Sequence, residues 1–230
     1  MTKKTTTICC AVALLATTAA TPALSQAKNF AGPSIAFGAG YNSMETPVNI
    51  IEDDGNAISN ITFGGSKHNF NYLADISYGI EMNKDFVISI GGTYDFSKSE
   101  SEILSGTDEN GYTASVKGKL KDHYSVYLQP TYLINSSTGI FAKASYNFAK
   151  ASYTIASNED SLSISDDVNG WGYGLGIKSF MNNNLFIQAE GSLTKYDRTT
   201  KNLVGESETI YDISSKPEVL SAIISIGYKF

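Results

Sequence analysis

The first candidates for chemistry in this 230-residue chain are its two histidines. His123 and Ser125 are two positions apart, so on an extended strand they point to the same face. A histidine base beside a serine nucleophile is the core of a hydrolytic triad, in which a carboxylate orients the histidine. No matching glutamate sits clearly on a neighbouring strand to complete that set. His68 is isolated, and two separate histidines do not make a metal site. We therefore expect no catalytic residues, no metal ligands and no cofactor.

Charged residues on otherwise small or polar strand faces are the second candidates. They are Asp75, Glu81, Asp95, Lys143, Lys178, Glu190 and Lys229. Inside a closed barrel such charges are costly unless they pair. Glu190, with Lys178 on the preceding strand, is the expected centre of the set. One interpretation is a gating salt-bridge network. We favour a static polar core, because an eight-stranded barrel is only just wide enough for its own side chains.

The segments that carry these residues alternate with period two, which indicates strands with two different faces. The clearest is 220–230, where every second residue is apolar or aromatic: Leu220, Ala222, Ile224, Ile226, Tyr228 and Phe230. The same pattern recurs in 34–42, 70–81, 86–97, 123–133, 140–148, 170–178 and 185–194. Pro130 falls inside one of these segments, which we keep as a strand because the alternation runs through it. The result is eight strands of about ten residues, the length that a tilted strand needs to cross a bilayer.

The connections between these strands alternate between long and short. The long ones are 43–68, 98–121, 149–169 and 196–216, and the short ones are 82–85, 135–139 and 181–184. Short turns on one rim and long loops on the other are typical of a bacterial outer-membrane barrel. A soluble, lipocalin-like barrel is the alternative. It would turn its apolar face inward, whereas here the apolar faces are large and aromatic and the opposite faces carry Gly, Ser, Asn and charges.

The N-terminus has the three parts of a secretory signal peptide. Lys3 and Lys4 are followed by an apolar stretch, 8–16, and then by small residues that allow cleavage between Ser25 and Gln26, with cleavage after Ala27 as the second choice. We therefore expect a signal peptide at 1–25 and a barrel domain at 26–230. Both cysteines would be removed with the signal. No later apolar run is long enough for a membrane-spanning helix.

Composition also limits the partners. The formal net charge is −6, and Arg198 is the only arginine. An acidic chain without arginine clusters is a poor match for nucleic acid, so we expect no nucleic-acid partner.

Three segments resemble the small outer-membrane barrels of the OmpA transmembrane-domain, OmpX and opacity-protein kind. They are IGYKF (226–230), GWGYGLGIKSFMNNNLFIQAEGSLTKYD (170–197) and YSVYLQPTYLINSSTGIFAKASYNF (124–148). The resemblance covers the whole mature chain and implies that the barrel-assembly machinery reads Ile226, Tyr228 and Phe230. Some lipid A deacylases of similar barrel type use a His-x-Ser pair that faces lipid. Here His123 and Ser125 would face the lumen or the rim.

These observations predict an all-β protein, an eight-stranded antiparallel transmembrane β-barrel with short periplasmic turns and four long extracellular loops. We expect it in the outer membrane of a Gram-negative cell, after Sec-type export, as a monomer. The expected role is structural or surface-interacting, like that of an adhesin or surface antigen, and non-enzymatic. A small, low-conductance porin gated by luminal charges and a lipid-modifying hydrolase are the alternatives. The expected partners are outer-membrane lipid, lipopolysaccharide, the assembly machinery and host surface proteins.

Overall fold

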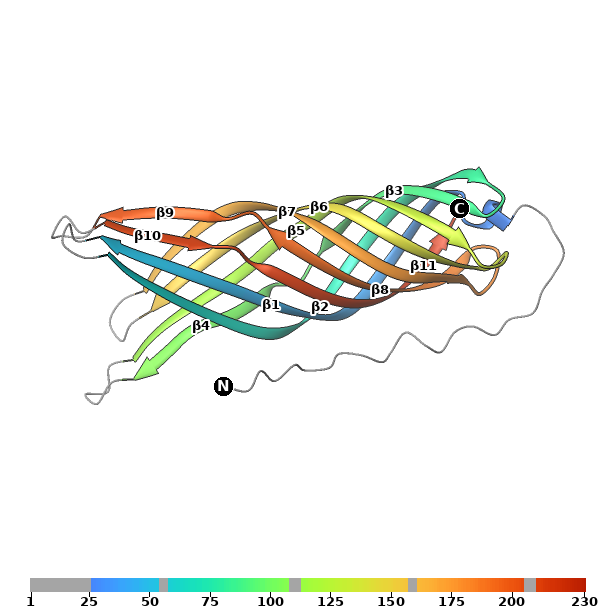
Figure 1. The fold of residues 1–230 in the computed structure, drawn as a ribbon. Helices are drawn as coiled ribbons and strands as arrows, with labels where there is room; N and C mark the ends of the chain where they lie inside the picture. Colours follow the sequence, from blue (N-terminus) through green and yellow to red (C-terminus); the bar gives the residue numbers. More distant parts are fainter. Residues whose placement is uncertain (1–25, 54–57, 108–112, 157–160, 205–209) are drawn as a thin grey trace, which may run out of the picture.

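The computed structural model describes residues 26–53, 58–107, 113–156, 161–204 and 210–230, and they form one closed antiparallel barrel (Figure 1). A single 3-10 turn, η1 (Gln26–Asn29), precedes the wall. The strand segments are β1 (Gly32–Asp53), β2 (Ile58–Asn83), β3 (Phe86–Asp95), β4 (Ser99–Thr107), β5 (Thr113–Leu133), β6 (Thr138–Ala156), β7 (Ser161–Phe180), β8 (Leu185–Tyr196), β9 (Thr199–Val204), β10 (Ile210–Ser215) and β11 (Glu218–Lys229). Within these residues no helix is long and apolar enough to cross a membrane.

Eight antiparallel strands make the wall, because three of them are each interrupted once. Short breaks separate β3 from β4, β8 from β9 and β10 from β11. The barrel closes through β1, which pairs with β2 on one side and with β10 and β11 on the other. The predicted fold class is thus confirmed.

The period-two pattern of the sequence becomes an outward apolar face and an inward small or polar face. Phe37, Ile76 and Leu175 are 59%, 67% and 71% exposed, whereas Gln129 and Asn147 are buried in the lumen. An exposed apolar band this extensive does not occur on monomeric soluble proteins, and it matches the lipid-facing band of a membrane barrel. The soluble alternative is therefore excluded.

A belt of aromatic pairs marks one boundary of that band. The ring centroids of Tyr124 and Phe148 are 4.8 Å apart, and those of Tyr146 and Trp171 are 5.2 Å apart. Aromatic residues gather where a membrane-spanning wall meets the headgroups. We call this the outer aromatic belt.

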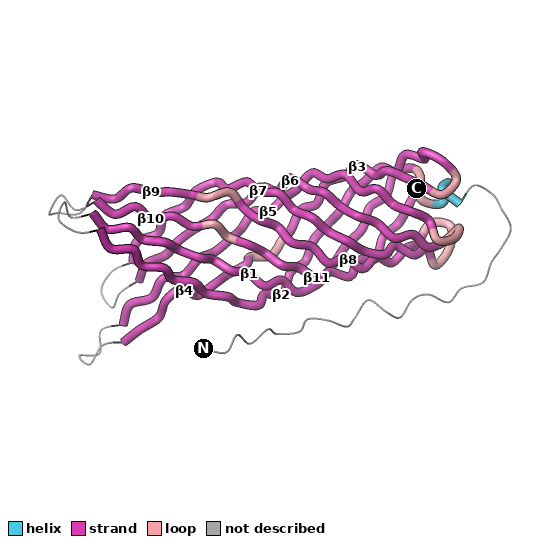
Figure 2. Tube along the Cα trace, in the orientation of Figure 1, coloured by secondary structure: helices cyan, strands magenta, loops and turns pink. Residues whose placement is uncertain are grey.

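The predicted short turns are confirmed (Figure 2). An asparagine side chain organises each one. The side-chain Oδ1 of Asn83 accepts from the N–H of Asp85 at 3.0 Å, and that of Asn135 accepts from Ser137 at 2.9 Å. In the third turn Asn182 accepts from the N–H of Leu185 at 2.7 Å. Such Asx bonds replace backbone pairing within a turn.

The long connections differ from their predicted irregular form. Most of 43–68 is strand, because the β1–β2 ladder continues without a break to Asp53 and Ile58. The other three long connections likewise extend the wall as β4–β5, β6–β7 and β9–β10 hairpins. Glycine and acidic residues in these segments suggested loops. Antiparallel pairing across a short tip holds them in strands nonetheless.

Beyond the outer aromatic belt the wall divides into two sheets. The β7–β8 ladder stops at Gly170 and Tyr196, and the β2–β3 ladder stops at Leu73 and Asp95. Further out, one sheet contains β9, β10, β1 and β2, and the other contains β4, β5, β6 and β7. Asn69 on β2 bridges the base of the gap between β2 and β4. Its side chain donates to the carbonyl of Glu100 and accepts from the N–H of the same residue.

Candidate functional site

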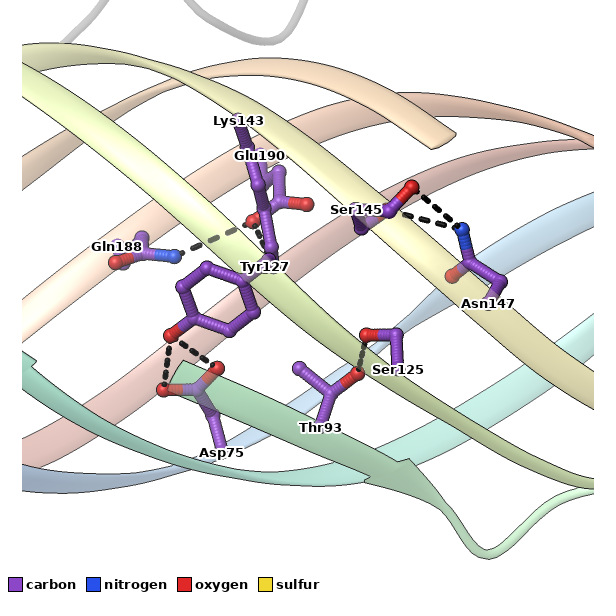
Figure 3. A network of polar contacts seen from close by, with 9 residues as sticks. All are labelled: Asp75, Thr93, Ser125, Tyr127, Lys143, Ser145, Asn147, Gln188 and Glu190. Atoms are coloured by element: carbon purple, nitrogen blue, oxygen red, sulfur yellow. Dashed lines mark hydrogen bonds and ion pairs between the residues drawn. The ribbon is translucent and has the colours of Figure 1, made fainter. Parts of the chain in front are cut away.

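An ion pair occupies the centre of the lumen (Figure 3). Lys143 on β6 and Glu190 on β8 meet with 3.1 Å between Nζ and Oε2, and both side chains are at most 10% exposed. Gln188 donates a further hydrogen bond to the same carboxylate oxygen at 3.4 Å. Paired and hydrogen-bonded in this way, the two charges can be tolerated away from bulk water.

Tyr127 extends this pair towards the opposite wall. Its hydroxyl donates to the carboxylate of Asp75 on β2, at 2.8 Å and 3.0 Å, and its ring centroid lies 4.2 Å from the Lys143 ammonium. Gly91 makes the room, since a Cβ there would lie 2.5 Å from the tyrosine hydroxyl. The chain Asp75–Tyr127–Lys143–Glu190 therefore crosses the lumen, and we call it the central polar chain.

A second polar layer lies between this chain and the outer rim. The hydroxyls of Thr93 and Ser125 share a hydrogen bond of 2.6 Å. Asn71 donates to Asp95 at 3.2 Å. The two layers line a cavity of about 50 Å³, which is enough for a water molecule or two.

Two layers of buried apolar side chains lie on either side of the polar zone. The layer near the short turns consists of Ala27, Phe30, Ala36, Val87, Leu133, Phe180 and Phe186. The layer near the outer rim consists of Met44, Leu120, Ala149, Ala151, Val168, Tyr196 and Val219. We call them the inner seal and the outer seal.

The inner seal depends on the segment before β1. Phe30 enters the barrel mouth, and its ring packs edge-on against Phe180 with 4.9 Å between centroids. Asn29 anchors the segment by donating to the carbonyl of Ser136 at 2.8 Å. Gly32, with φ of 104°, then turns the chain into β1, a backbone geometry that favours glycine.

Glu190 does not pair with Lys178 as the sequence suggested. The β7–β8 register places Gln188 opposite Lys178 and Gly176 opposite Glu190. Glu190 instead reaches past the glycines of β7 to Lys143 on the far side. Lys178 lies over the Phe186 ring, with its Nζ 3.8 Å from the centroid.

The other predicted charges are spread along the barrel. Asp75 belongs to the central polar chain, and Asp95 bonds Asn71 and the neighbouring Ser97. Glu81 is exposed near the first short turn. Lys229 donates to the carbonyl of Lys28 at 3.0 Å, next to the inner seal and not within the polar zone. A gating role for the set stays a prediction.

The predicted terminal signals have the following places. Ile226, Tyr228 and Phe230 lie on the outward face of the closing strand and are 55%, 42% and 70% exposed. Their reading by assembly machinery stays a prediction. Ser25 lies outside the described residues, and Gln26 begins η1, so cleavage between them stays a prediction as well.

The His-x-Ser pair is not arranged for hydrolysis. His123 donates from Nε2 to the side-chain carbonyl of Asn147 at 3.2 Å, whereas Ser125 bonds Thr93. A base must reach its nucleophile to activate it. Among the described residues no group of three or more His, Cys, Asp or Glu is placed to hold a metal ion.

Sequence reasoning missed three features of the lumen. Tyr127 lies within the predicted strand 123–133 but was not among the predicted network residues, although a buried tyrosine needs a polar partner. Phe30 fell outside every predicted strand. Tyr196 was placed in a loop, yet it is fully buried in the outer seal. Its period-two spacing from Thr194 was the available signal.

Solved structures with similar folds include proteins of bacterial outer membranes. OprG of Pseudomonas aeruginosa is 17% identical, with a TM-score of 0.51 over 87% of this chain and 96% of that one. The protease OmpT of Escherichia coli is 9% identical, with a TM-score of 0.53 over 86% and 96%. Ail, the attachment invasion locus protein of Yersinia pestis, is 18% identical, with a TM-score of 0.40 over 87% and 99%. At these identities the likeness concerns the fold alone.

A comparison with curated protein sequences finds no match. The family model of the outer membrane protein beta-barrel domain, in contrast, matches residues 9–230, which include every strand described above. The chain therefore belongs to the outer-membrane β-barrel family.

Proposed function

We propose that this protein is a non-enzymatic surface-interaction protein, in which a sealed barrel displays strand hairpins outside the cell. The observation that carries the proposal is the contrast between the two halves of the wall. The membrane half is closed, with a polar zone between the inner and outer seals. The outer half divides where the β7–β8 and β2–β3 ladders stop, and among the described residues it leaves one edge of β9 and one edge of outer β7 unpaired.

The open edges are the surface that would make contact. Among the described residues, β9 pairs only with β10, and the outer part of β7, 161–168, pairs only with β6. An unpaired edge offers a row of N–H and C=O groups to which an extended segment of another protein can add. Host surface proteins with accessible extended segments are the partners that this geometry suits.

A low-conductance porin is the alternative that the luminal charges favour. Conduction would require both seals to move, because each is built of packed apolar side chains. The cavity of about 50 Å³ between them supports a static interior. The separate bonding of His123 and Ser125 argues against the hydrolase alternative.

The proposal includes a route to the membrane. The chain would be exported by a Sec-type signal, and its closing strand, with Ile226, Tyr228 and Phe230, would be read by the barrel-assembly machinery. The barrel would act as a monomer, since its closed wall leaves no sheet edge within the membrane.

The test is binding by whole cells with and without the hairpins. Cells displaying the intact chain should bind immobilised extracellular-matrix proteins and cultured epithelial cells. Trimming the β9–β10 and β6–β7 hairpins, with β8 and β11 intact, should remove most of that binding. Glu190→Gln, buried in the lumen, is the matched control and should bind normally. A gel-mobility shift between boiled and unboiled samples verifies that each barrel folds. Binding that survives trimming would leave a purely structural role.

A further inference from the structure

A bulge in β5 changes which side chains face outward near the outer rim. Lys121 pairs with Lys150 on β6, and Tyr124 pairs with Phe148. Two residues of β5, Asp122 and His123, therefore lie opposite a single residue of β6, Ala149. Asp122, in the bulge, has φ of 53°, a left-handed value that is uncommon outside glycine. Such strained positions persist where surrounding structure holds them, often at functional sites.

The bulge turns a row of lysines to the outside. Below it, Tyr124 and the even-numbered residues of β5 face lipid. Above it the parity is reversed, so Leu120 is buried in the outer seal while Lys117, Lys119 and Lys121 occupy the outward positions. We call these three residues, together with Lys150, the lysine row.

Like charges meet within this row. Lys121 and Lys150 are directly opposite on neighbouring strands, an arrangement that is destabilising unless an anion compensates it. Two carboxylates lie nearby: Glu100 bonds Lys119 at 2.7 Å, and Asp167 is 4.0 Å from Lys150. Within the described part of the chain, Lys121 has no carboxylate within ion-pair distance. The row is therefore only partly neutralised.

The height of the row identifies the layer of the membrane that it meets. It begins directly above the stacked rings of Tyr124 and Phe148, which belong to the outer aromatic belt. Aromatic belts lie at the headgroup level, so Lys121 and Lys150, the next pair of the β5–β6 ladder, and Lys119, two pairs beyond them, reach the polar headgroups of the outer leaflet. Lysine ammonium groups are point donors suited to phosphate oxygens.

We propose that the lysine row binds a phosphate group in the glycolipid headgroup of the outer leaflet, the lipid A part of lipopolysaccharide. The phosphate lies between Lys121 and Lys150, where the two ammonium groups are otherwise opposed. Lys119 exchanges between this phosphate and Glu100. The bulge at Asp122 is the structural device that sets the lysines at this height.

The experiment uses the full-length mature chain refolded in detergent micelles. Binding of lipid A with two phosphates is measured against lipid A from which both phosphates have been removed. The variant is Lys119→Gln/Lys121→Gln/Lys150→Gln. The control, Lys84→Gln/Lys195→Gln/Lys216→Gln, removes the same charge at exposed sites outside the row. A gel-mobility shift confirms that each variant is folded.

The proposal expects the intact chain and the control to prefer the phosphorylated lipid, and the row variant to lose roughly tenfold or more of its affinity for that lipid. High salt should weaken the preference. Equal affinity of the intact chain for the two lipids would overturn the proposal. So would a row variant that binds like the control. A loss seen with a sulfated polysaccharide fragment but not with lipid A would also overturn it, by reassigning the row to a soluble polymer.

Discussion

The Lys143 ammonium and the Glu190 carboxylate meet across the glycine face of β7, at 3.1 Å, although they stand on strands that do not pair with each other. Gly174 and Gly176 make this possible, because their positions face these two side chains in the ladders. Within this row of alternate glycines, Gly174 leaves the space for the ion pair, since a Cβ there would lie 3.2 Å from the Glu190 carboxylate, whereas a Cβ at Gly176 would meet the Phe141 ring.

Glu190→Ala should destabilise the barrel by about 3–5 kcal/mol, because it leaves a buried ammonium without its partner. Replacing both residues, as Lys143→Met/Glu190→Met, should recover most of the loss, since no unpaired charge remains. Urea unfolding of the refolded protein in lipid vesicles measures both. Equal losses in the single and double variants would show that packing, and not charge, is what the pair supplies.

The same variant separates a static core from a gate. Because the inner and outer seals do not depend on Glu190, planar-bilayer recordings of both the intact chain and Glu190→Ala should show no channels. Channels that open only in the variant would support the gating interpretation. Channels in both would favour the porin alternative.

Phe30→Ala should open the inner seal. Removing a buried phenylalanine ring costs about 3–5 kcal/mol in a well-packed core, and less at a barrel mouth where the neighbours can collapse. Val87 lies in the same seal and is fully buried, so a Val87→Cys thiol should resist a water-soluble maleimide in the intact background. It should react in the Phe30→Ala background. Equal labelling in both would mean that Phe30 does not close the mouth.

Substitution by alanine should change the stability of the fold in opposite directions at two glycines. A Cβ at Gly227 would overlap the buried Phe186 ring, whereas a Cβ at Gly191 has no atom nearer than the Ser221 carbonyl oxygen at 4.0 Å. Gly227→Ala should therefore destabilise the fold by at least about 1 kcal/mol through overpacking. Gly191→Ala should stabilise it by about 0.4–1 kcal/mol by restricting the unfolded chain. The urea unfolding midpoints of the two variants measure this, and the midpoint should fall for Gly227→Ala and rise for Gly191→Ala. Midpoints that shift in the same direction would contradict the prediction.

The strands and their two faces could be predicted from sequence because period-two alternation is a local signal. Spacing alone predicts the outward direction of Phe37, Tyr124 and Trp171. The large aromatic faces and the alternation of long and short connections indicated the membrane, and the resemblance of 170–197 and 124–148 to small outer-membrane barrels agreed with it.

Partners inside the lumen could not be predicted, because they depend on register across several strands. Glu190 was matched with the lysine of the adjacent strand, but the register offered it a glycine there and a lysine one strand further away. The lysine row was hidden for a related reason. Its K-x-K-x-K spacing at 117–121 is strand-like, but the bulge at Asp122 reverses its face relative to the strand that follows.

Glu100 provides a pH test outside the membrane-spanning part of the wall. A hydrogen bond from Lys119 holds the pKa of its carboxyl below the usual 4.5. A depressed carboxyl pKa adds stability that is present above the unfolded-state pKa and is lost as the pH falls through the folded-state pKa. The contribution of Glu100 to folding stability should therefore be lost only below about pH 4.5. It should not exceed about 1 kcal/mol, because the pair is exposed to solvent.

The measurement is a carboxyl carbon NMR titration of Glu100 in the refolded protein. Lys119→Gln should raise the pKa of Glu100 towards its usual value, whereas Lys84→Gln, on the opposite rim, should leave it unchanged. Addition of phosphorylated lipid A to the intact chain should also raise that pKa, because a phosphate that draws Lys119 away takes the hydrogen bond from the carboxylate. If Lys119→Gln left the pKa of Glu100 unchanged, the 2.7 Å contact between the two side chains would not persist in solution.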